Sequence, residues 1–169
     1  MVRYQSKALT MSLLHPTHFS KPSLTFAGLR AYIPYSEVST IGGLWEDFWG
    51  TLEKIEGKQG ATCFGLSLIS DKPQEGFDYL VAVLVDPSVA QPADVSVFAM
   101  PAQTYACFDH KGALTEVPAL CQAILNDWAP QSETGINYGT GCSLIEHYRE
   151  DFDPSKPGGL EIWTPTGAA

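Results

Sequence analysis

The stretch CSLIEHY, residues 142 to 148, decides how the fold of this chain is interpreted. Polar and apolar residues alternate along it, which is typical of a β-strand whose successive side chains point to opposite faces. Glu146 then shares a face with Leu144 and Tyr148, while His147 points to the other face. A carboxylate in that setting is costly to bury unless a partner compensates its charge. Two interpretations stay open: this face is solvated, or Glu146 lies at the bottom of an aromatic pocket that receives a cation.

The composition favours one folded domain with cationic partners. A length of 169 residues suits one domain of ordinary size, and a hydrophobic content of 44% argues against a disordered chain. The formal net charge is −9, and the lysines and arginines form no cluster. Direct nucleic-acid binding is therefore not expected, and a cation is a more natural ligand than a phosphate.

Membrane and redox signals point to the cytoplasm. No apolar run approaches the roughly 18 residues that a membrane span needs, and no signal-peptide cleavage pattern follows the N-terminal residues. The cysteines form no CxxC pair, and each lies in an apolar run. We therefore expect a cytoplasmic protein without membrane association, whose four cysteines are reduced core residues: Cys63, Cys107, Cys121 and Cys142.

Hydrophobic periodicity predicts strands and two amphipathic helices in a repeated order. The order strand, helix, strand, strand occurs over about residues 24–85 and again over about residues 103–165. We expect an α+β fold of two repeats related by a pseudo-two-fold axis, with an antiparallel sheet, helices on one side and a central ligand cleft. Residues 1–21 are expected to form an N-terminal arm, and 22–169 a single domain. The predicted strands cover residues 24–32, 61–69, 77–85, 95–98 (an edge strand), 103–110, 142–148 and 159–165, and the helices cover 41–55 and 114–128.

The first repeat contains two further signals. Trp45 and Trp49 are four residues apart and so share one face of the first helix. Trp45 is expected in the core, whereas Trp49 lies at the edge of the apolar arc and is the better candidate for a half-exposed pocket wall. Gly28, inside the first strand, indicates a bulge or the close approach of another backbone.

In order and spacing, these features resemble the GyrI-like small-molecule-binding domain, which also serves as the effector-binding module of AraC-type and MerR-type transcription regulators. The resemblance covers about residues 24–165. Those regulators also carry a DNA-binding helix-turn-helix segment, for which residues 1–23 are too few, so we expect a stand-alone domain. The matching stretches are AGLRAYIP, GGLWEDFWGTL, FDYLVAVLV, MPAQTYACFDHKG, AILNDWAP, LIEHY and LEIWTP.

The resemblance implies a central cleft that binds bulky, often cationic, aromatic compounds. The glutamate of the LIEHY stretch usually meets the cation in this family, which carries over to Glu146. The aromatic residue two positions further on carries over to Tyr148. Aromatic residues of the last strand and the first helix often close the pocket, which suggests Trp163 and Trp49.

The physical requirements of a lipophilic cation add two candidates. Aromatic faces attract such cations by roughly 0.5–2 kcal/mol each, and a partly buried carboxylate adds about 1.5–3 kcal/mol. Tyr79 and Glu161 join the candidate ligand-binding residues if their strands meet at the cleft. Glu161 shares a face with Trp163, and the alternative for Glu161 is an exposed position at the rim.

We therefore predict a binding domain for lipophilic, cationic organic compounds, in preference to an enzyme. One alternative is a small-molecule hydrolase in which pocket carboxylates such as Glu146 and Glu161 activate water. Another is a protein-binding inhibitor or regulator of a topoisomerase or transcription system, with a transcription-related protein or a second copy of the chain as partner. No catalytic residue, cofactor or metal is expected, because no Walker, Rossmann or zinc pattern occurs.

Overall fold

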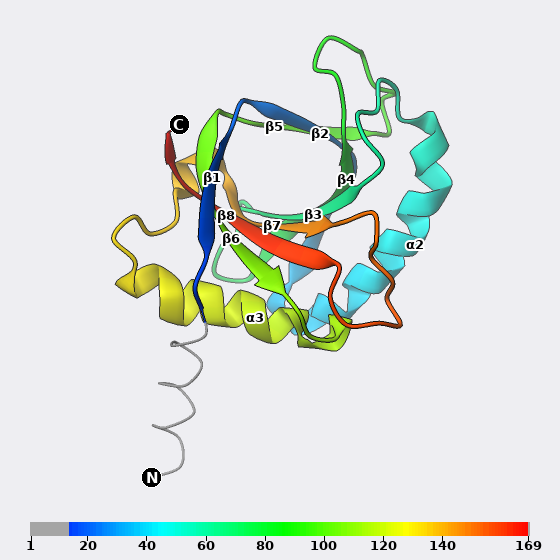
Figure 1. The fold of residues 1–169 in the computed structure, drawn as a ribbon. Helices are drawn as coiled ribbons and strands as arrows, with labels where there is room; N and C mark the ends of the chain where they lie inside the picture. Colours follow the sequence, from blue (N-terminus) through cyan, green and yellow to red (C-terminus); the bar gives the residue numbers. More distant parts are fainter. Residues whose placement is uncertain (1–13, 169) are drawn as a thin grey trace.

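An antiparallel sheet of eight strands curls around an apolar interior in the computed structural model, which describes residues 14–168 (Figure 1). The strand order across the sheet is β1-β6-β8-β7-β3-β4-β2-β5. The α+β fold class predicted from the sequence is confirmed. The strands are β1 (Thr17–Lys21), β2 (Leu24–Pro34), β3 (Cys63–Leu68), β4 (Gly76–Leu84), β5 (Ser96–Met100), β6 (Gln103–His110), β7 (Cys142–Tyr148) and β8 (Leu160–Ala168).

The sheet consists of two halves that meet at its centre. One half contains β2, β3 and β4 with helix α2 (Ile41–Thr51), and the other contains β6, β7 and β8 with helix α3 (Val117–Ala123). Strands β3 and β7 pair with each other and join the halves. The strand that precedes each half is exchanged, because β1 pairs with β6 and β5 pairs with β2. Each half thus has the predicted order of strand, helix, strand, strand.

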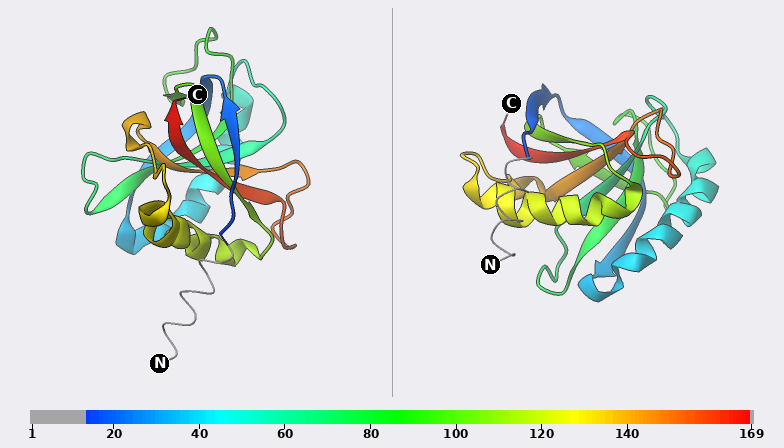
Figure 2. Two further views of the ribbon diagram at one scale, coloured as in Figure 1. Left: turned by 60° about the vertical axis from the view of Figure 1, so that its left-hand side comes forward. Right: turned by 60° about the horizontal axis from the view of Figure 1, so that its bottom comes forward.

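Both helices pack on the outer face of the curled sheet (Figure 2). The apolar stripe of the first helix continues beyond α2 into the 3-10 turn η2 (Leu52–Lys54), and the chain becomes extended at Ile55. The second predicted helix is divided into η3 (Leu114–Glu116), α3 and the π-helical turn η4 (Ile124–Trp128). Pro118 lies in the first turn of α3, where its missing N–H costs no helical hydrogen bond. Shorter turns are η1 (Tyr35–Thr40), η5 (Ala129–Gln131) and η6 (Tyr138–Thr140).

Alternation along the strands divides the core between the two faces of the sheet. The inner cluster is built from strand residues such as Phe64, Ile145 and Trp163. Two outer clusters lie under the helices, one with Phe48 of α2 and one with Leu144 and Ile124. The predicted orientation of the β7 side chains is therefore confirmed. Leu144 packs under α3 on the outer face of the sheet, and Ile145 packs in the inner cluster.

The N-terminal arm was expected to extend to residue 21, and this expectation is wrong for its last part. Thr17–Lys21 forms β1, which pairs with β6 from Thr17 opposite Cys107 to Lys21 opposite Gln103. This strand lacks the apolar pattern by which strands are recognised in a sequence, because it lies at the edge of the sheet and has a solvated face. Residues 1–13 of the arm lie outside the described residues.

Two smaller expectations concern Gly28 and the cysteines. A Cβ atom at Gly28 would lie 1.8 Å from the carbonyl oxygen of Val81, so the predicted close backbone approach is confirmed. All four cysteines are free. Within residues 14–168 no helix combines the length and apolarity needed to cross a membrane.

Candidate functional site

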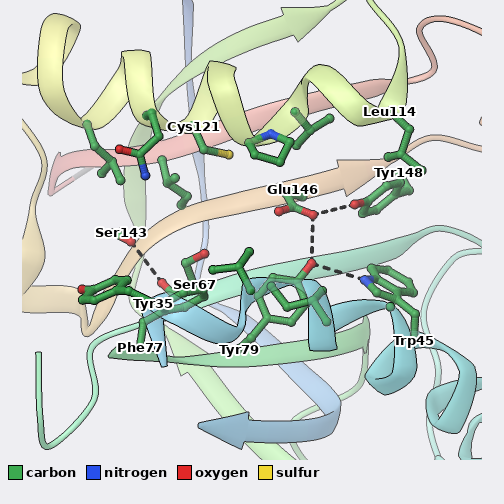
Figure 3. Close-up of a pocket in the computed structure, with 18 residues that line it drawn as sticks. Tyr35, Trp45, Ser67, Phe77, Tyr79, Leu114, Cys121, Ser143, Glu146 and Tyr148 are labelled. Carbon is green, nitrogen blue, oxygen red and sulfur yellow. Dashed lines mark hydrogen bonds between the residues drawn. The ribbon is translucent and has the colours of Figure 1, made fainter. Parts of the chain in front are cut away.

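A pocket of about 400 Å³ lies between α2 and α3, over the central strands of the sheet (Figure 3). Strands β3, β4 and β7 contribute its floor, and the two helices contribute its walls. Apolar and aromatic side chains dominate, with a few polar groups among them, which is the usual character of a small-molecule site. The lining residues are Tyr35, Val38, Ile41, Gly42, Trp45, Ser67, Phe77, Tyr79, Leu114, Val117, Pro118, Cys121, Gln122, Leu125, Ser143, Leu144, Glu146 and Tyr148.

Glu146 is the centre of a hydrogen-bond network in this pocket. The hydroxyl groups of Tyr79 and Tyr148 donate to its Oε2 atom at 2.8 and 2.5 Å, and the indole N–H of Trp45 donates to the Tyr79 hydroxyl oxygen at 3.4 Å (Figure 3). Both hydroxyls therefore use the same carboxylate oxygen. Within the described part of the chain no hydrogen bond reaches the other oxygen, Oε1, which leaves it available to a ligand.

Burial governs the protonation of these groups. It raises the pKa of Glu146, and the hydrogen bonds from Tyr148 and Tyr79 only partly oppose this effect. Burial, together with the nearby Glu146 charge, also raises the pKa of Tyr79 and of Tyr148. Both phenols therefore stay protonated and act as donors. The ionised form of Glu146 therefore has fewer partners within the fold than its burial requires.

Aromatic rings surround the carboxylate. The rings of Trp45 and Tyr148 meet edge to face, with centroids 4.9 Å apart and planes at 74°. Tyr79 is almost fully buried, with 1% of its surface exposed, and it approaches Glu146 from β4. Trp45 comes from α2, whereas Tyr148 comes from β7. Three separate elements thus place aromatic groups around one acidic group.

Gly65 of β3 makes this arrangement possible. It pairs directly with Glu146 of β7, and a Cβ atom at this position would lie only 2.0 Å from the Tyr79 hydroxyl oxygen and 3.0 Å from Glu146 Oε2. Any side chain here would occupy the space through which Tyr79 reaches the carboxylate. A glycine inside a strand commonly marks such a close approach.

The structure brings together three of the six predicted ligand-binding residues, namely Glu146, Tyr148 and Tyr79. Trp49 lies outside the pocket and is 54% exposed, and its place in the wall is taken by Trp45, which had been expected in the core. The amphipathic stripe shows which arc of α2 faces the protein. It does not show which part of that arc faces the second helix.

Trp163 and Glu161 lie on the opposite face of the sheet. Trp163 is 5% exposed and belongs to the inner cluster. In the pairing of β7 with β8, Glu161 is opposite His147, whereas Glu146 is opposite Ile162. Because paired residues share a face and neighbours alternate, Glu146 and Glu161 point away from each other. The prediction that both carboxylates line one cleft is therefore wrong.

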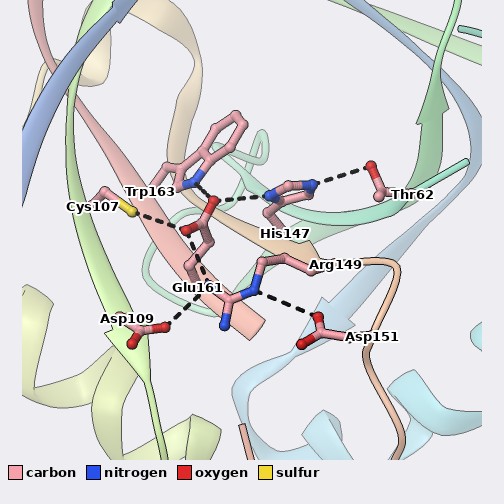
Figure 4. A network of polar contacts seen from close by, with 8 residues as sticks. All are labelled: Thr62, Cys107, Asp109, His147, Arg149, Asp151, Glu161 and Trp163. Atoms are coloured by element: carbon pink, nitrogen blue, oxygen red, sulfur yellow. Dashed lines mark hydrogen bonds and ion pairs between the residues drawn. The ribbon is translucent and has the colours of Figure 1, made fainter. Parts of the chain in front are cut away.

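Glu161 instead belongs to a second polar network (Figure 4). Its carboxylate lies 2.9 Å from His147 Nδ1, 2.9 Å from the Trp163 indole nitrogen and 3.4 Å from Arg149 Nη1. Burial opposes ionisation of Glu161, but hydrogen bonds with His147, Trp163 and Cys107 outweigh that cost and lower its pKa. This carboxylate is already compensated within the fold and needs no ligand.

Comparison with known proteins places the chain in a family. Residues 19–166 match the GyrI-like small molecule binding domain. The chain belongs to this family. Its curled sheet with two outer helices is the fold of this domain, and the resemblance noted in the sequence is confirmed.

Relatives of this GyrI-like domain include transcription regulators. The transcriptional regulator BrlR of Pseudomonas aeruginosa is 27% identical over 139 residues, which cover 82% of this chain and 50% of BrlR. The chain thus spans half the length of that curated relative.

Solved structures with this fold include a ligand complex and a DNA complex. The structure of SAV2435 bound to tetraphenylphosphonium has a TM-score of 0.70 at 20% identity and covers 90% of this chain and 93% of that one. The EcmrR C-terminal domain has a TM-score of 0.62 at 16% identity, and the match covers 92% of this chain and 98% of that domain. EcmrR in its complex with DNA has a TM-score of 0.66 at 15% identity, and the match covers 99% of this chain and 68% of the EcmrR chain. Direct DNA binding by this GyrI-like domain is untested, and its absence stays a prediction.

Sequence reasoning missed several residues of the pocket in this GyrI-like domain. Gly65 had a detectable signal, since glycine is unusual inside an apolar strand. Leu114 and Cys121 belong to the second predicted helix, Phe77 begins a predicted strand, and Tyr35 lies outside the predicted elements. These residues line the pocket because α2 and α3 converge over β3 and β7, and periodicity within one element does not reveal that convergence.

The role of Gly65 can be tested with Gly65→Ala. We expect the added methyl group to displace Tyr79 from Glu146 and to lower the free energy of unfolding by about 1–3 kcal/mol, as overpacking does. Urea unfolding followed by tryptophan fluorescence measures this change. The matched control is Gly43→Ala on α2, where nothing lies within 4 Å of the added Cβ and stability should be kept or improved. Equal stability of Gly65→Ala and the parent protein would contradict the close-approach argument.

Proposed function

We propose that this GyrI-like domain binds lipophilic organic cations in the pocket between α2 and α3, with Glu146 as the counter-charge. The observation that carries the proposal is the environment of the Glu146 carboxylate. It is the one charged side chain among the described residues that line the pocket, and both tyrosine hydroxyls donate to Oε2 alone. The free Oε1 atom is the natural contact for a cationic ligand.

The energetics of the pocket support a cation over a neutral ligand. An ionised carboxylate that is buried without a countercharge costs free energy, and a bound cation recovers part of that cost. The faces of Trp45, Tyr79 and Tyr148 offer further attraction of roughly 0.5–2 kcal/mol each. The pocket volume of about 400 Å³ is in the range of small-molecule sites.

The relatives support the choice of ligand class. SAV2435 shares the fold and has been solved with tetraphenylphosphonium, which is a lipophilic cation. BrlR is a transcriptional regulator, so an effector-binding role is a reasonable extension of the proposal. A hydrolase that uses Glu146 and Glu161 together has no support, because a sheet separates the two carboxylates.

Replacing Glu146 by glutamine tests the counter-charge. We expect Glu146→Gln to bind tetraphenylphosphonium at least tenfold more weakly, which corresponds to about 1.4 kcal/mol, in a calorimetric titration. Its melting temperature should not fall, because burial already disfavours the charged form of Glu146. Glu53→Gln is the matched control, since it removes the same charge from an exposed position outside the pocket. Unchanged affinity of Glu146→Gln would refute the proposed role.

Binding should also depend on pH. Only ionised Glu146 attracts the cation, so affinity should fall as the pH is lowered through the pKa of this carboxyl. An exposed glutamate has a pKa of about 4.3. Because burial raises the pKa of Glu146, its loss of affinity should begin at a higher pH than it would for an exposed glutamate. Titrations of tetraphenylphosphonium from about pH 8 to about pH 5 measure this effect. A neutral analogue, triphenylphosphine oxide, and the Glu146→Gln variant should both give flat profiles, and a flat profile for the parent protein would contradict the prediction.

The two tryptophans of α2 provide an internal comparison. Trp45→Ala should weaken tetraphenylphosphonium binding about 2- to 30-fold, because an aromatic wall is lost. Trp49→Ala should leave the affinity unchanged, since Trp49 lies outside the pocket. Calorimetry measures both, and thermal unfolding checks that each variant is folded. A larger loss in Trp49→Ala than in Trp45→Ala would reverse the assignment of the wall.

A further inference from the structure

The end of the pocket away from the Glu146 network is polar but uncharged. Ser67 of β3 and Ser143 of β7 lie at this end, near Tyr35, while Glu146, Tyr148 and Trp45 lie at the other (Figure 3). Ser67 pairs with Leu144 on one side and with Tyr79 on the other, and both of these residues line the pocket. Its side chain therefore points to the same face as Glu146.

Ser67 occupies the position that mirrors Glu146 in the other half of the sheet. Both β3 and β7 begin with a cysteine, and Ser67 and Glu146 are each the fifth residue of their strand. The pairing is centred on Leu66 opposite Ile145, with Glu146 one pair to one side and Ser67 one pair to the other. Along the strands the two positions are about 7 Å apart. One symmetric site thus has a carboxylate at one end and a hydroxyl group at the other.

A β-bulge in the pairing of β3 with β7 adds a second hydroxyl group at the uncharged end of the pocket. Ser67 is paired with Leu144 and Leu68 with Cys142, so Ser143 is the extra residue on β7. Simple alternation from Leu144 would point Ser143 away from the pocket, and the bulge instead turns it towards the pocket, as bulges commonly do. Its hydroxyl group donates to the backbone oxygen of Ser67 at 3.3 Å. In the described part of the chain the Ser67 hydroxyl has no hydrogen-bond partner, so it is available to a ligand.

The charge distribution disfavours a ligand with two cationic groups. A first cation has Glu146 as its partner, but no other charged side chain occurs among the described residues that line the pocket, so a second cation would find no counter-charge. Removing a charge from water without a counter-ion is costly, whereas a neutral hydroxyl or amide can exchange its hydrogen bonds with water for bonds to Ser67.

We propose that the pocket is selective for ligands with a single cationic centre, and that Ser67 binds a neutral hydrogen-bonding group at the other end of the same molecule. This inference rests on the proposed function and specifies its ligand class. It assigns Ser67 as the residue that distinguishes monocations from dications.

Three compounds with one biphenyl core test the inference. The first carries a trimethylammonium group at one end, the second adds a hydroxyl group at the other end, and the third carries trimethylammonium groups at both ends. Calorimetry on the parent protein should show the hydroxylated monocation binding about 2- to 10-fold more tightly than the plain one. The dication should bind at least tenfold more weakly than the hydroxylated monocation.

Two variants assign the selectivity to Ser67. Ser67→Ala should weaken binding of the hydroxylated compound about 2- to 10-fold and so remove its advantage over the plain monocation. Ser67→Asp supplies a second carboxylate and should make the dication the preferred ligand. Thermal unfolding verifies that each variant is folded, and the alanine variant tests the hydroxyl contact on its own if the aspartate variant is unstable.

The outcomes separate this inference from the proposed function. If the monocations bind but the dication binds equally well, the inference is overturned while the cation pocket stands. If Ser67→Ala weakens the plain and hydroxylated compounds alike, Ser67 has only a structural role and the inference is again overturned. If none of the three compounds binds, the proposed function fails and the inference fails with it.

Discussion

The pocket depends on one constraint, which is that the carboxylate of Glu146 is buried without a full set of partners. Tyr79 and Tyr148 satisfy one of its oxygens, and Gly65 leaves the space that Tyr79 needs to reach it. Burial raises the pKa of Glu146 and makes its ionised form costly. A fold that retains such a group gives up stability, and natural proteins commonly do so at binding sites.

The curled sheet explains why two glutamates on neighbouring strands behave differently. Glu146 points towards the helices and has two hydroxyl donors, and its pKa is raised. Glu161 points to the other face, where His147, Trp163 and Arg149 surround it, and its pKa is lowered. The number and charge of the donors decide the direction, since both carboxylates are partly or largely removed from water. Glu161 is therefore compensated within the fold, whereas Glu146 has hydroxyl donors on one oxygen only.

Much of the fold was predictable because periodicity within one element reflects local burial. The alternation in β7 correctly placed Leu144 and Glu146 on one face, and the apolar stripe of residues 41–55 correctly located the first helical segment. Strand β1 was missed because an edge strand with exposed residues has no apolar pattern to recognise. The pocket wall was assigned to the wrong tryptophan of α2, because Trp45 lines the pocket and Trp49 is exposed outside it. The sequence of one helix does not reveal the direction from which a second helix approaches it.

By itself, the sequence determined the α+β class, the order of elements in each half, the family and the central acidic residue Glu146. These follow from local patterns and from the order of motifs along the chain. Only the tertiary structure decided that Tyr79 and Trp45 complete the hydrogen-bond network of Glu146 and that Gly65 leaves space for the Tyr79 hydroxyl. It also decided that Glu161 lies on the opposite face of the sheet. Such facts depend on the pairing register of β3 with β7 and on the convergence of α2 with α3. Both are long-range properties, because they join residues from opposite halves of the chain.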